Sequence, residues 1–170
     1  MRMRTVLVTA LGGAVVGAAL VAAGPVLHAQ GGAAAAAKLF TSSSDVRAMI
    51  AKAKAERKAD QPNFTQPIVA LAPYSANLEY RVAGLNAPAS THMKDAELFV
   101  VIEGGGTVVT GGHLQNERAT NADNASGTGI DGGDSRRIAA GDFVLVPQGT
   151  PHWFTQIDGT LVMMSLHLPH

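Results

Sequence analysis

The sequence predicts an all-β protein, a single small sandwich or barrel of short strands, preceded by one short helix. From Pro67 onward, short apolar runs alternate with Gly, Pro, Asn and Asp, which is the pattern of a β-sandwich or barrel. The 170 residues, 46% of them hydrophobic, are enough for one domain with a real core and few for two. A helical spacing of apolar residues occurs in one segment before these runs.

Residues 1–29 have the features of a Sec-type signal peptide. Arg2 and Arg4 make the N-terminus positive, residues 6–27 carry no charge, and Ala29 is a small residue suited to cleavage. The alternative is an uncleaved membrane anchor, because an uncharged run of about 22 residues is long enough to cross a bilayer. A Gly-Pro pair near its end favours cleavage. We therefore expect a bacterial protein that is periplasmic or secreted, without stable membrane insertion once the signal is removed.

A linker and a helix are expected between the signal peptide and the barrel. Residues 30–44 are rich in Gly, Ala and Ser and have little to bury, which predicts the linker. Residues 45–60 are the predicted helix: Ser44 or Asp45 can cap its start, and an Asp-Gln-Pro sequence ends it. Its charged residues are expected to form a solvated face. The barrel is expected over residues 67–170.

The barrel segment divides into short strands, turns and one long loop. Gly104-Gly105-Gly106 and Asp158-Gly159 are expected to form turns between neighbouring strands. Residues 111–135 hold many Gly, Asn, Asp and Thr and few apolar residues, so they are predicted to form a long loop. An Asn124-Ala125-Ser126 sequon in this loop is assigned no role. The strands are expected at Ile68–Leu71, Leu78–Val82, Leu98–Glu103, Thr107–Thr110, Arg137–Ala139, Phe143–Val146, His152–Ile157 and Thr160–Leu168.

Charge and composition exclude several classes of partner and site. With 13 basic and 13 acidic residues the formal net charge is zero, so no excess of positive charge favours binding to DNA or RNA. The chain contains no cysteine, which removes disulfides, thiolate metal sites and thiol nucleophiles. Any metal must therefore be held by nitrogen and oxygen.

A carboxylate on an apolar strand marks the first part of a candidate site. His92 and Glu97 are five residues apart across a polar turn. Glu97 then begins a strongly apolar strand on which Glu97, Phe99 and Val101 share one face. Burying a carboxylate costs several kcal/mol unless it is paired or binds a metal. Glu97 therefore requires a partner.

His152 supplies this partner from another predicted strand. His152, Phe154 and Gln156 share one face of that strand. Two histidines and one glutamate on adjoining strands suit a divalent transition metal, and iron, manganese, nickel, zinc and cobalt all remain open. Phe99 and Phe154 would line the cavity. Gln156 would either orient a ligand there or satisfy a neighbouring backbone group.

These segments resemble the two sequence motifs of the cupin superfamily. The first motif is matched by Gly84, five residues, Ser90, one residue, His92, four residues, Glu97, six residues and Gly104. The second is matched by Gly141, five residues, Pro147, one residue, Gly149, two residues and His152, with Gln156 at the position of a trailing asparagine. The resemblance implies a small single-domain cupin β-barrel, jelly-roll-like, with one metal ion bound by the residues at positions 90, 92, 97 and 152.

Ser90 departs from the family pattern, which normally has a histidine at that position. A serine hydroxyl is a poorer neutral ligand than imidazole, so only His92, Glu97 and His152 are carried over as metal ligands. Ser90 lies two residues before His92 on an extended segment and is expected to project into the same cavity.

The site and the resemblance predict a metal-dependent enzyme of dioxygenase, isomerase or lyase type that acts on a small organic molecule. The alternative is a non-catalytic periplasmic module that binds or senses a small ligand or a metal. The sequence shows no unambiguous general base beside the ligands and so does not select between them. His113, His167 and His170 are expected at the surface. A homodimer is compatible with the sequence.

Overall fold

The computed structural model describes residues 37–169 of the chain. The predicted signal peptide at residues 1–29 and the first part of the predicted linker lie outside these described residues. Within residues 37–169, no helix is both long enough and apolar enough to span a bilayer.

Helix α1 (Ser43–Glu56) starts and ends earlier than the predicted range of 45–60. Ser42 is the N-cap: its hydroxyl accepts from the backbone N–H of Asp45, whose carboxylate accepts from the backbone N–H of Ser42. This reciprocal capping box satisfies two N–H groups that the first turn leaves without helical partners. The helix stops because Arg57 leaves the helical conformation, with ψ at 130°, and its guanidinium group donates to backbone carbonyls of the following turn.

Eleven strands follow in the described part of the chain. The first strand begins before residue 67, where the barrel was expected to start. Pro67 lies inside it at a β-bulge, and it is tolerated because the strand is at the edge of the sheet, where a missing N–H breaks no ladder. The strands are β1 (Asn63–Leu71), β2 (Tyr74–Val82), β3 (Ala89–His92), β4 (Asp95–Thr110), β5 (His113–Gln115), β6 (Arg118–Asn121), β7 (Asn124–Gly127), β8 (Gly129–Asp131), β9 (Asp134–Ala139), β10 (Phe143–Val146) and β11 (His152–Pro169).

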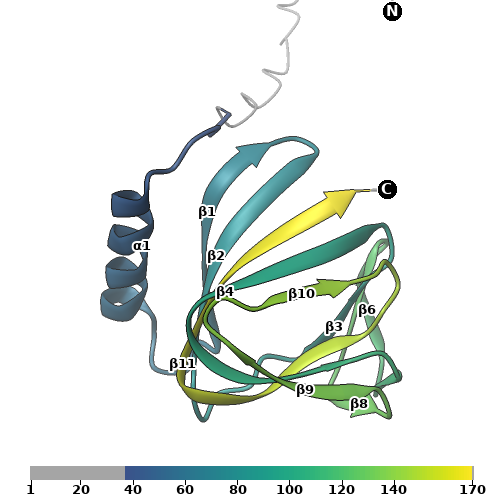
Figure 1. Ribbon diagram of the computed structural model, residues 1–170. Helices are drawn as coiled ribbons and strands as arrows, with labels where there is room; N and C mark the ends of the chain where they lie inside the picture. The colour runs from purple at the N-terminus through teal and green to yellow at the C-terminus, as the bar shows by residue number, and fades with distance from the viewer. Residues whose placement is uncertain (1–36, 170) are drawn as a thin grey trace, which may run out of the picture. The chain divides into compact units, whose positions relative to one another are not determined.

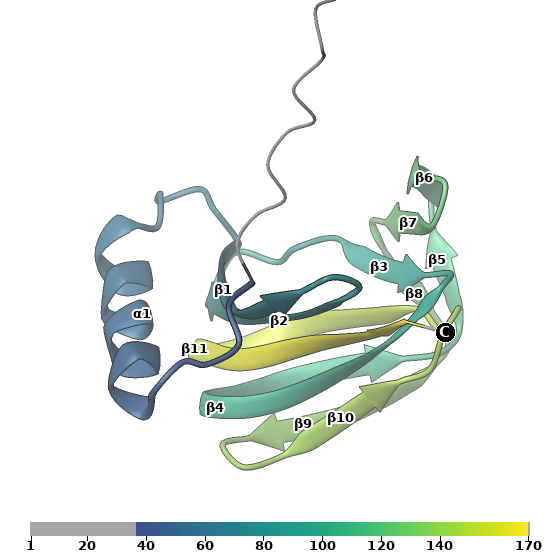
Figure 2. The same cartoon turned by 90° about the horizontal axis from the view of Figure 1, so that it is seen from above.

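Two long strands, β4 and β11, pass through both sides of the barrel (Figures 1 and 2). The first half of β4 pairs with β10 and with the second half of β11; β11 pairs in turn with β2, and β2 pairs with the edge strand β1. The second half of β4 pairs with β9 and with the first half of β11, which continues through β3 and β7 to β6. All of these pairs are antiparallel, so the predicted jelly-roll-like all-β fold is confirmed.

The glycine segments predicted as turns are bends inside continuous strands instead. Gly104 to Gly106 lie within β4, and Asp158-Gly159 lie within β11. The register between the two strands shifts at this point, which bends both of them together. A Cβ on Gly104 or Gly106 would overlap a backbone carbonyl of β11, so these positions need glycine for the close approach of two backbones.

The predicted long loop at residues 111–135 is also wrong, because the segment contains the four short strands β5 to β8. Strand β7 pairs with β3 and carries β6 at its other side, while β5 pairs with β8. All four residues of β6 are exposed. Strands with so little to bury show no alternation of apolar and polar residues, and the sequence pattern therefore resembles a loop.

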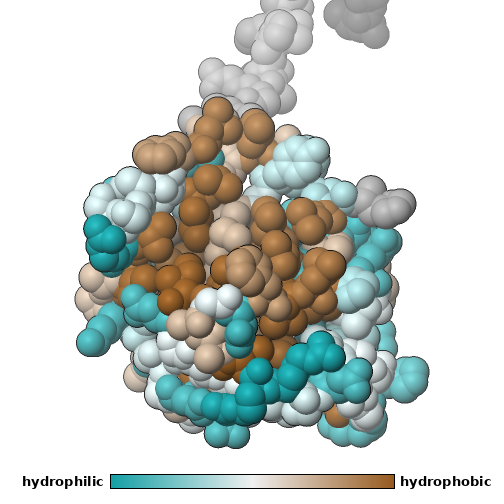
Figure 3. All heavy atoms as spheres, viewed as in Figure 1, coloured by the Kyte–Doolittle hydropathy of each residue, from teal (hydrophilic) through white to brown (hydrophobic). Residues whose placement is uncertain are grey.

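The described residues form two hydrophobic clusters, one inside the barrel and one between the barrel and α1. The inner cluster fills the barrel and contains Phe99, Val101, Val108, Ile138, Val144, Val146, Phe154, Ile157, Leu161 and Met163. The outer cluster joins the sheet to α1 through Ala53, Leu78, Tyr80 and Val162. Phe143 and Leu145 of β10 remain 71% and 59% exposed. Figure 3 shows hydrophobic side chains gathered on the face seen in Figure 1.

Candidate metal centre

The three predicted ligands come together from three strands. His92 ends β3, Glu97 lies near the start of β4, and His152 begins β11. One ligand atom of each residue lies within 4.8 Å of the other two, in a cluster that is able to hold a metal ion. Glu97 and His152 are buried, and His92 is half-buried. The cluster therefore sits inside the barrel wall with one side open toward solvent.

One carboxylate oxygen of Glu97 faces both imidazole rings. Glu97 Oε2 lies 3.2 Å from Nε2 of His92 and 3.2 Å from Nε2 of His152. The other oxygen, Oε1, accepts a hydrogen bond from the hydroxyl of Ser165. Although Oε2 is buried, no donor in the described part of the chain forms a hydrogen bond with it. Its lone pairs and the two ring nitrogens therefore converge on one point.

The charges of the cluster depend on one another. Burial raises the pKa of Glu97, but the contacts with His152 and His92 and the hydroxyl of Ser165 outweigh burial and hold this pKa far below its usual value. The contact with Glu97 raises the pKa of His92, against the effect of burial. In the metal-free chain, the carboxylate is thus ionised throughout the physiological range and stabilises a proton on His92.

A hydrogen bond from His92 to β7 sets which ring nitrogen faces the cluster. His92 Nδ1 lies 2.6 Å from Oδ1 of Asn124, its Cα partner across the β3–β7 pair. The Asn124 amide is oriented in turn, since its Nδ2 donates to Oδ1 of Asn121. An amide oxygen only accepts, so Nδ1 of His92 must carry the proton. The neutral ring then presents the lone pair of Nε2, which is the form that binds a metal.

The geometry fits a small divalent transition metal. Metal–nitrogen distances of about 2.0–2.1 Å place neighbouring donors about 3.0–3.4 Å apart in tetrahedral or octahedral sites. The two distances of 3.2 Å at Glu97 Oε2 fall in this range. A buried oxygen without a hydrogen-bond donor, opposite two imidazoles, is also what a cation would satisfy. A nitrogen and oxygen donor set of this kind accepts iron, manganese, nickel or zinc.

The residues predicted to line the cavity fall into two groups. Ser90 is the Cα partner of His152 across the β3–β11 pair, so the two side chains project to the same face. Phe99 and Phe154 are buried, and their ring centroids are 5.1 Å apart in an edge-to-face arrangement. The ring of Phe99 is also 5.6 Å from that of His152. These three residues lie beside the cluster.

Gln156 does not share the inward face, and its predicted orientation is wrong. The register of β11 against β4 shifts between Phe154 and Gln156, which marks a β-bulge. The extra residue reverses the alternation, so that Ile157 is buried and Gln156 is exposed. The Gln156 amide donates to Asp158 at the surface.

The expectation that His167 lies at the surface is also wrong. His167 is the Cα partner of Glu97, and its side chain is 25% exposed. Its Nε2 lies 3.4 Å from Oε1 of Glu97, and its Nδ1 lies 3.4 Å from Oδ2 of Asp95. The sequence did contain a signal, because Met163, Ser165 and His167 alternate along the last predicted strand. Asn124 offered none, since it lies in a segment without recognisable strands.

The barrel interior has a polar wall on β2 that the sequence analysis also missed. Arg81 and Glu79 form a half-buried ion pair with an N···O distance of 2.7 Å. They are the Cα partners of the buried residues Leu161 and Met163 of β11, which places them on the inward face of the sheet. The guanidinium group of Arg81 lies 4.7 Å from the ring centroid of Phe154. The interior therefore offers polar groups as well as aromatic rings to a ligand.

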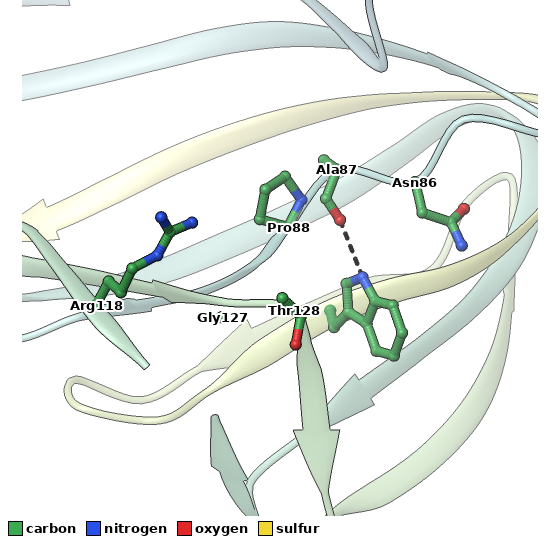
Figure 4. Close-up of a pocket in the computed structure, with 7 residues that line it drawn as sticks. Asn86, Ala87, Pro88, Arg118, Gly127 and Thr128 are labelled. Atoms are coloured by element: carbon green, nitrogen blue, oxygen red, sulfur yellow. Dashed lines mark hydrogen bonds between the residues drawn. The ribbon is translucent and has the colours of Figure 1, made fainter. Parts of the chain in front are cut away.

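A separate pocket of about 250 Å³ lies outside the cluster (Figure 4). Its lining comes from the segment before β3, from β6, from the region after β7, and from Trp153. The Trp153 indole donates to the backbone carbonyl of Ala87 at 2.9 Å, which fixes one wall of the pocket. None of the three clustered ligands lines it.

Comparison with known proteins identifies the fold. No family model matches the sequence, and no curated protein matches it. The DMSP lyase DddQ from Ruegeria pomeroyi DSS-3 is a solved structure with 20% sequence identity, a TM-score of 0.51, and coverage of 77% of this chain and 66% of that chain. The present chain thus spans about two thirds of that lyase.

Two other similar structures carry informative names. The cupin domain of Cnp3 from Schizosaccharomyces pombe has 12% identity and a TM-score of 0.47, with 69% of this chain and 72% of that chain covered. KdgF from Halomonas sp. has 13% identity and a TM-score of 0.46, with 67% and 86% covered. The similarity to DddQ shows a shared fold, and the strand topology of the described residues is that of a jelly-roll-like barrel. At 20% identity this similarity shows the fold alone.

Proposed function

We propose that this protein is an exported metal-binding cupin enzyme that acts on a small organic molecule at a divalent metal held by His92, Glu97 and His152. One observation carries the proposal: the buried Oε2 of Glu97 lies 3.2 Å from two Nε2 atoms and accepts no hydrogen bond from the described residues. While Nε2 of both rings is unprotonated, this buried acceptor has no donor, which costs about 1–3 kcal/mol or more, and a bound cation removes this cost. Aliphatic side chains would fill the same space without the cost of a buried acceptor that has no donor.

Each residue around the cluster has a role in this proposal. When bound, a divalent metal supplies Lewis-acid catalysis or activates oxygen, at coordination positions that three protein ligands leave open. Asn124 holds His92 in the tautomer that presents Nε2, and Ser165 orients the Glu97 carboxylate. Phe99 and Phe154 keep water away from one side of the site. The ion pair of β2 offers contacts to polar groups of a ligand.

Dioxygenase, isomerase and lyase reactions all remain within the proposal. The fold is shared with a DMSP lyase, so lyase chemistry is carried by at least one protein of this architecture. A small molecule is the expected partner, and the balanced charge gives no support to nucleic acid. A homodimer is part of the proposal and is supported by the exposed Phe143 and Leu145 of β10.

The features of residues 1–29 support export to the periplasm or beyond. Intact mass of the protein recovered from a bacterial periplasmic extract tests this part. The expected chain begins near Gln30 and has lost Arg2 and Arg4. A full-length mass in the membrane fraction would instead show that the segment is an uncleaved anchor.

Elemental analysis of the purified protein tests the metal site. We expect one transition-metal ion per chain, and loss of this metal in Glu97→Gln and His152→Ala. His113→Ala is the matched control, because His113 is exposed on β5 and lies outside the cluster. Equal metal content in all four proteins would refute the assignment.

Turnover separates the enzyme from the alternative function, a non-catalytic module that binds or senses a small ligand or a metal. The metal-loaded protein is assayed against panels of small organic substrates for oxygen consumption, isomerisation and elimination. Activity that disappears on chelation and returns with metal supports the enzyme. Ligand binding by calorimetry without turnover in any panel would favour the binding module.

A further inference from the structure

His167 occupies the same level of the barrel as the candidate metal ligands. In the antiparallel pair of β4 and β11, Glu97 is opposite His167 and Phe99 is opposite Ser165. Residues directly opposite each other project to the same face, with Cβ atoms about 4.5–5.5 Å apart. Glu97, Phe99 and Ser165 are all at most 4% exposed. The backbone register therefore directs the His167 ring to the inward face beside Glu97.

His167 lies next to the three clustered residues, on the side of the other carboxylate oxygen of Glu97. Its Nε2 lies 3.4 Å from Glu97 Oε1, against 3.2 Å between Oε2 and Nε2 of each of the other two histidines. Its ring centroid is 4.9 Å from that of His92, which is closer than the 5.3 Å between His92 and His152. Donors that share one small metal ion are about 3.0–3.4 Å apart. His92 and His152 thus lie beside Oε2 of Glu97, whereas His167 lies beside Oε1 and outside the group of donors that are all within 4.8 Å of one another. A metal that binds all three imidazoles therefore needs both carboxylate oxygens or a turn of one side chain.

The ring of His167 is also oriented from behind. Its Nδ1 lies 3.4 Å from the Asp95 carboxylate, two residues before Glu97 on β4. A carboxylate at Nδ1 is the arrangement that leaves Nε2 of a histidine free to coordinate. For His92, the amide oxygen of Asn124 has the same position relative to the ring. Both rings therefore turn Nε2 toward Glu97.

We propose that His167 is a fourth protein ligand of the metal centre and supplies, from β11, the imidazole that is missing where Ser90 stands on β3. The inference rests on the proposed function, since it requires that the cluster binds a metal. It assigns a donor outside both motifs that the sequence analysis identified. A set of three imidazoles and one carboxylate replaces the three-ligand set, with Ser90 left to contact water or substrate.

X-ray absorption of the Co(II)-loaded full-length protein tests the proposal directly, because scattering from imidazole rings counts the bound histidines. We expect three imidazoles in the wild type and two in His167→Gln. A parallel Co(II) titration is expected to show an affinity lower by at least tenfold in His167→Gln. His113→Gln, the same exchange at an exposed histidine of β5, is expected to match the wild type. Circular dichroism confirms that each variant is folded.

A third variant separates ligation from positioning. Ser165→Ala removes the hydroxyl that orients Glu97 and leaves every imidazole in place, so it should retain three imidazoles. Two imidazoles in the wild type, unchanged in His167→Gln, would overturn the inference and leave the three-ligand site intact. Two imidazoles in both proteins, together with a weaker Co(II) affinity in His167→Gln, would make His167 a positioning residue for Glu97. That result would also overturn the inference that His167 is a ligand. A wild type that binds no Co(II) would overturn the proposed function as well.

Discussion

Replacing Asn124 with alanine should weaken metal binding without unfolding the barrel. The variant loses the hydrogen bond of 2.6 Å that keeps the proton on Nδ1 of His92. A net hydrogen bond contributes about 0.5–1.5 kcal/mol, and about 1.4 kcal/mol corresponds to a tenfold change in affinity. Loss of a partner that orients a ligating histidine typically costs about 10- to 100-fold in metal affinity. We therefore expect the Zn(II) affinity to fall about tenfold or more.

Competition titration of Zn(II) against a chromophoric chelator at one pH measures this effect. Asn124→Asp keeps an acceptor for Nδ1 and should bind at least as tightly as the wild type. Asn86→Ala is the matched control, because the Asn86 amide donates to the Thr155 carbonyl and does not contact the cluster. Wild-type affinity in Asn124→Ala would refute the argument that His92 coordinates through Nε2.

Three further predictions concern the site, the bend and the pH. In the His167→Gln background, Ser90→His should tighten Zn(II) binding by adding an imidazole opposite His152, and equal affinities would mean that residue 90 does not reach the metal. Gly104→Ala should lower the free energy of unfolding, measured in urea, by about 2 kcal/mol or more, and Gly84→Ala should lower it by less. Both glycines have a positive φ, but only Gly104 lies against another backbone. Equal losses in the two variants would therefore contradict this account of the bend. Because the pKa of His92 is raised in the folded metal-free protein, its protonation should stabilise the fold most below about pH 6.5, and this contribution should be lost as the pH rises. The same pH dependence of stability in His92→Gln would exclude His92 as its cause.

The overall fold could be predicted because its core strands are strongly apolar on one face. The segments at Leu98–Glu103 and Phe143–Val146 are nearly continuous apolar runs bounded by Gly, Asp or Pro, and the structure pairs them with each other. The Gly104–Gly106 segment was misinterpreted, since glycine serves both a chain reversal and a close approach of two backbones. Strands β5 to β8 were missed because they are three or four residues long, and the positions that β7 and β8 bury hold Ala125, Gly127 and Gly129, which give no apolar pattern.

The candidate ligands His92, Glu97 and His152 could be selected because each stands at a fixed offset inside a local motif. The prediction for Gln156 was wrong because a β-bulge between Phe154 and Gln156 reverses the side chains that follow it, up to the next register shift, and leaves no mark in the sequence spacing. Asn124 could not be selected at all. Its contact with His92 depends on the pairing of β3 with β7, and neither strand was predicted.

His167 shows why such a motif specifies strands more reliably than it specifies donors. The residues of the motif determine where β3, β4 and β11 begin and bend, and these strands determine which positions face the interior at one level. Once Glu97 is fixed, its register partner on β11 faces the same interior, whatever residue stands there. A donor lost at Ser90 is therefore replaceable from the opposite strand without any change in the backbone. The set of ligands in a cupin barrel has to be derived from strand register, and a missing motif histidine does not by itself mean a weaker metal site.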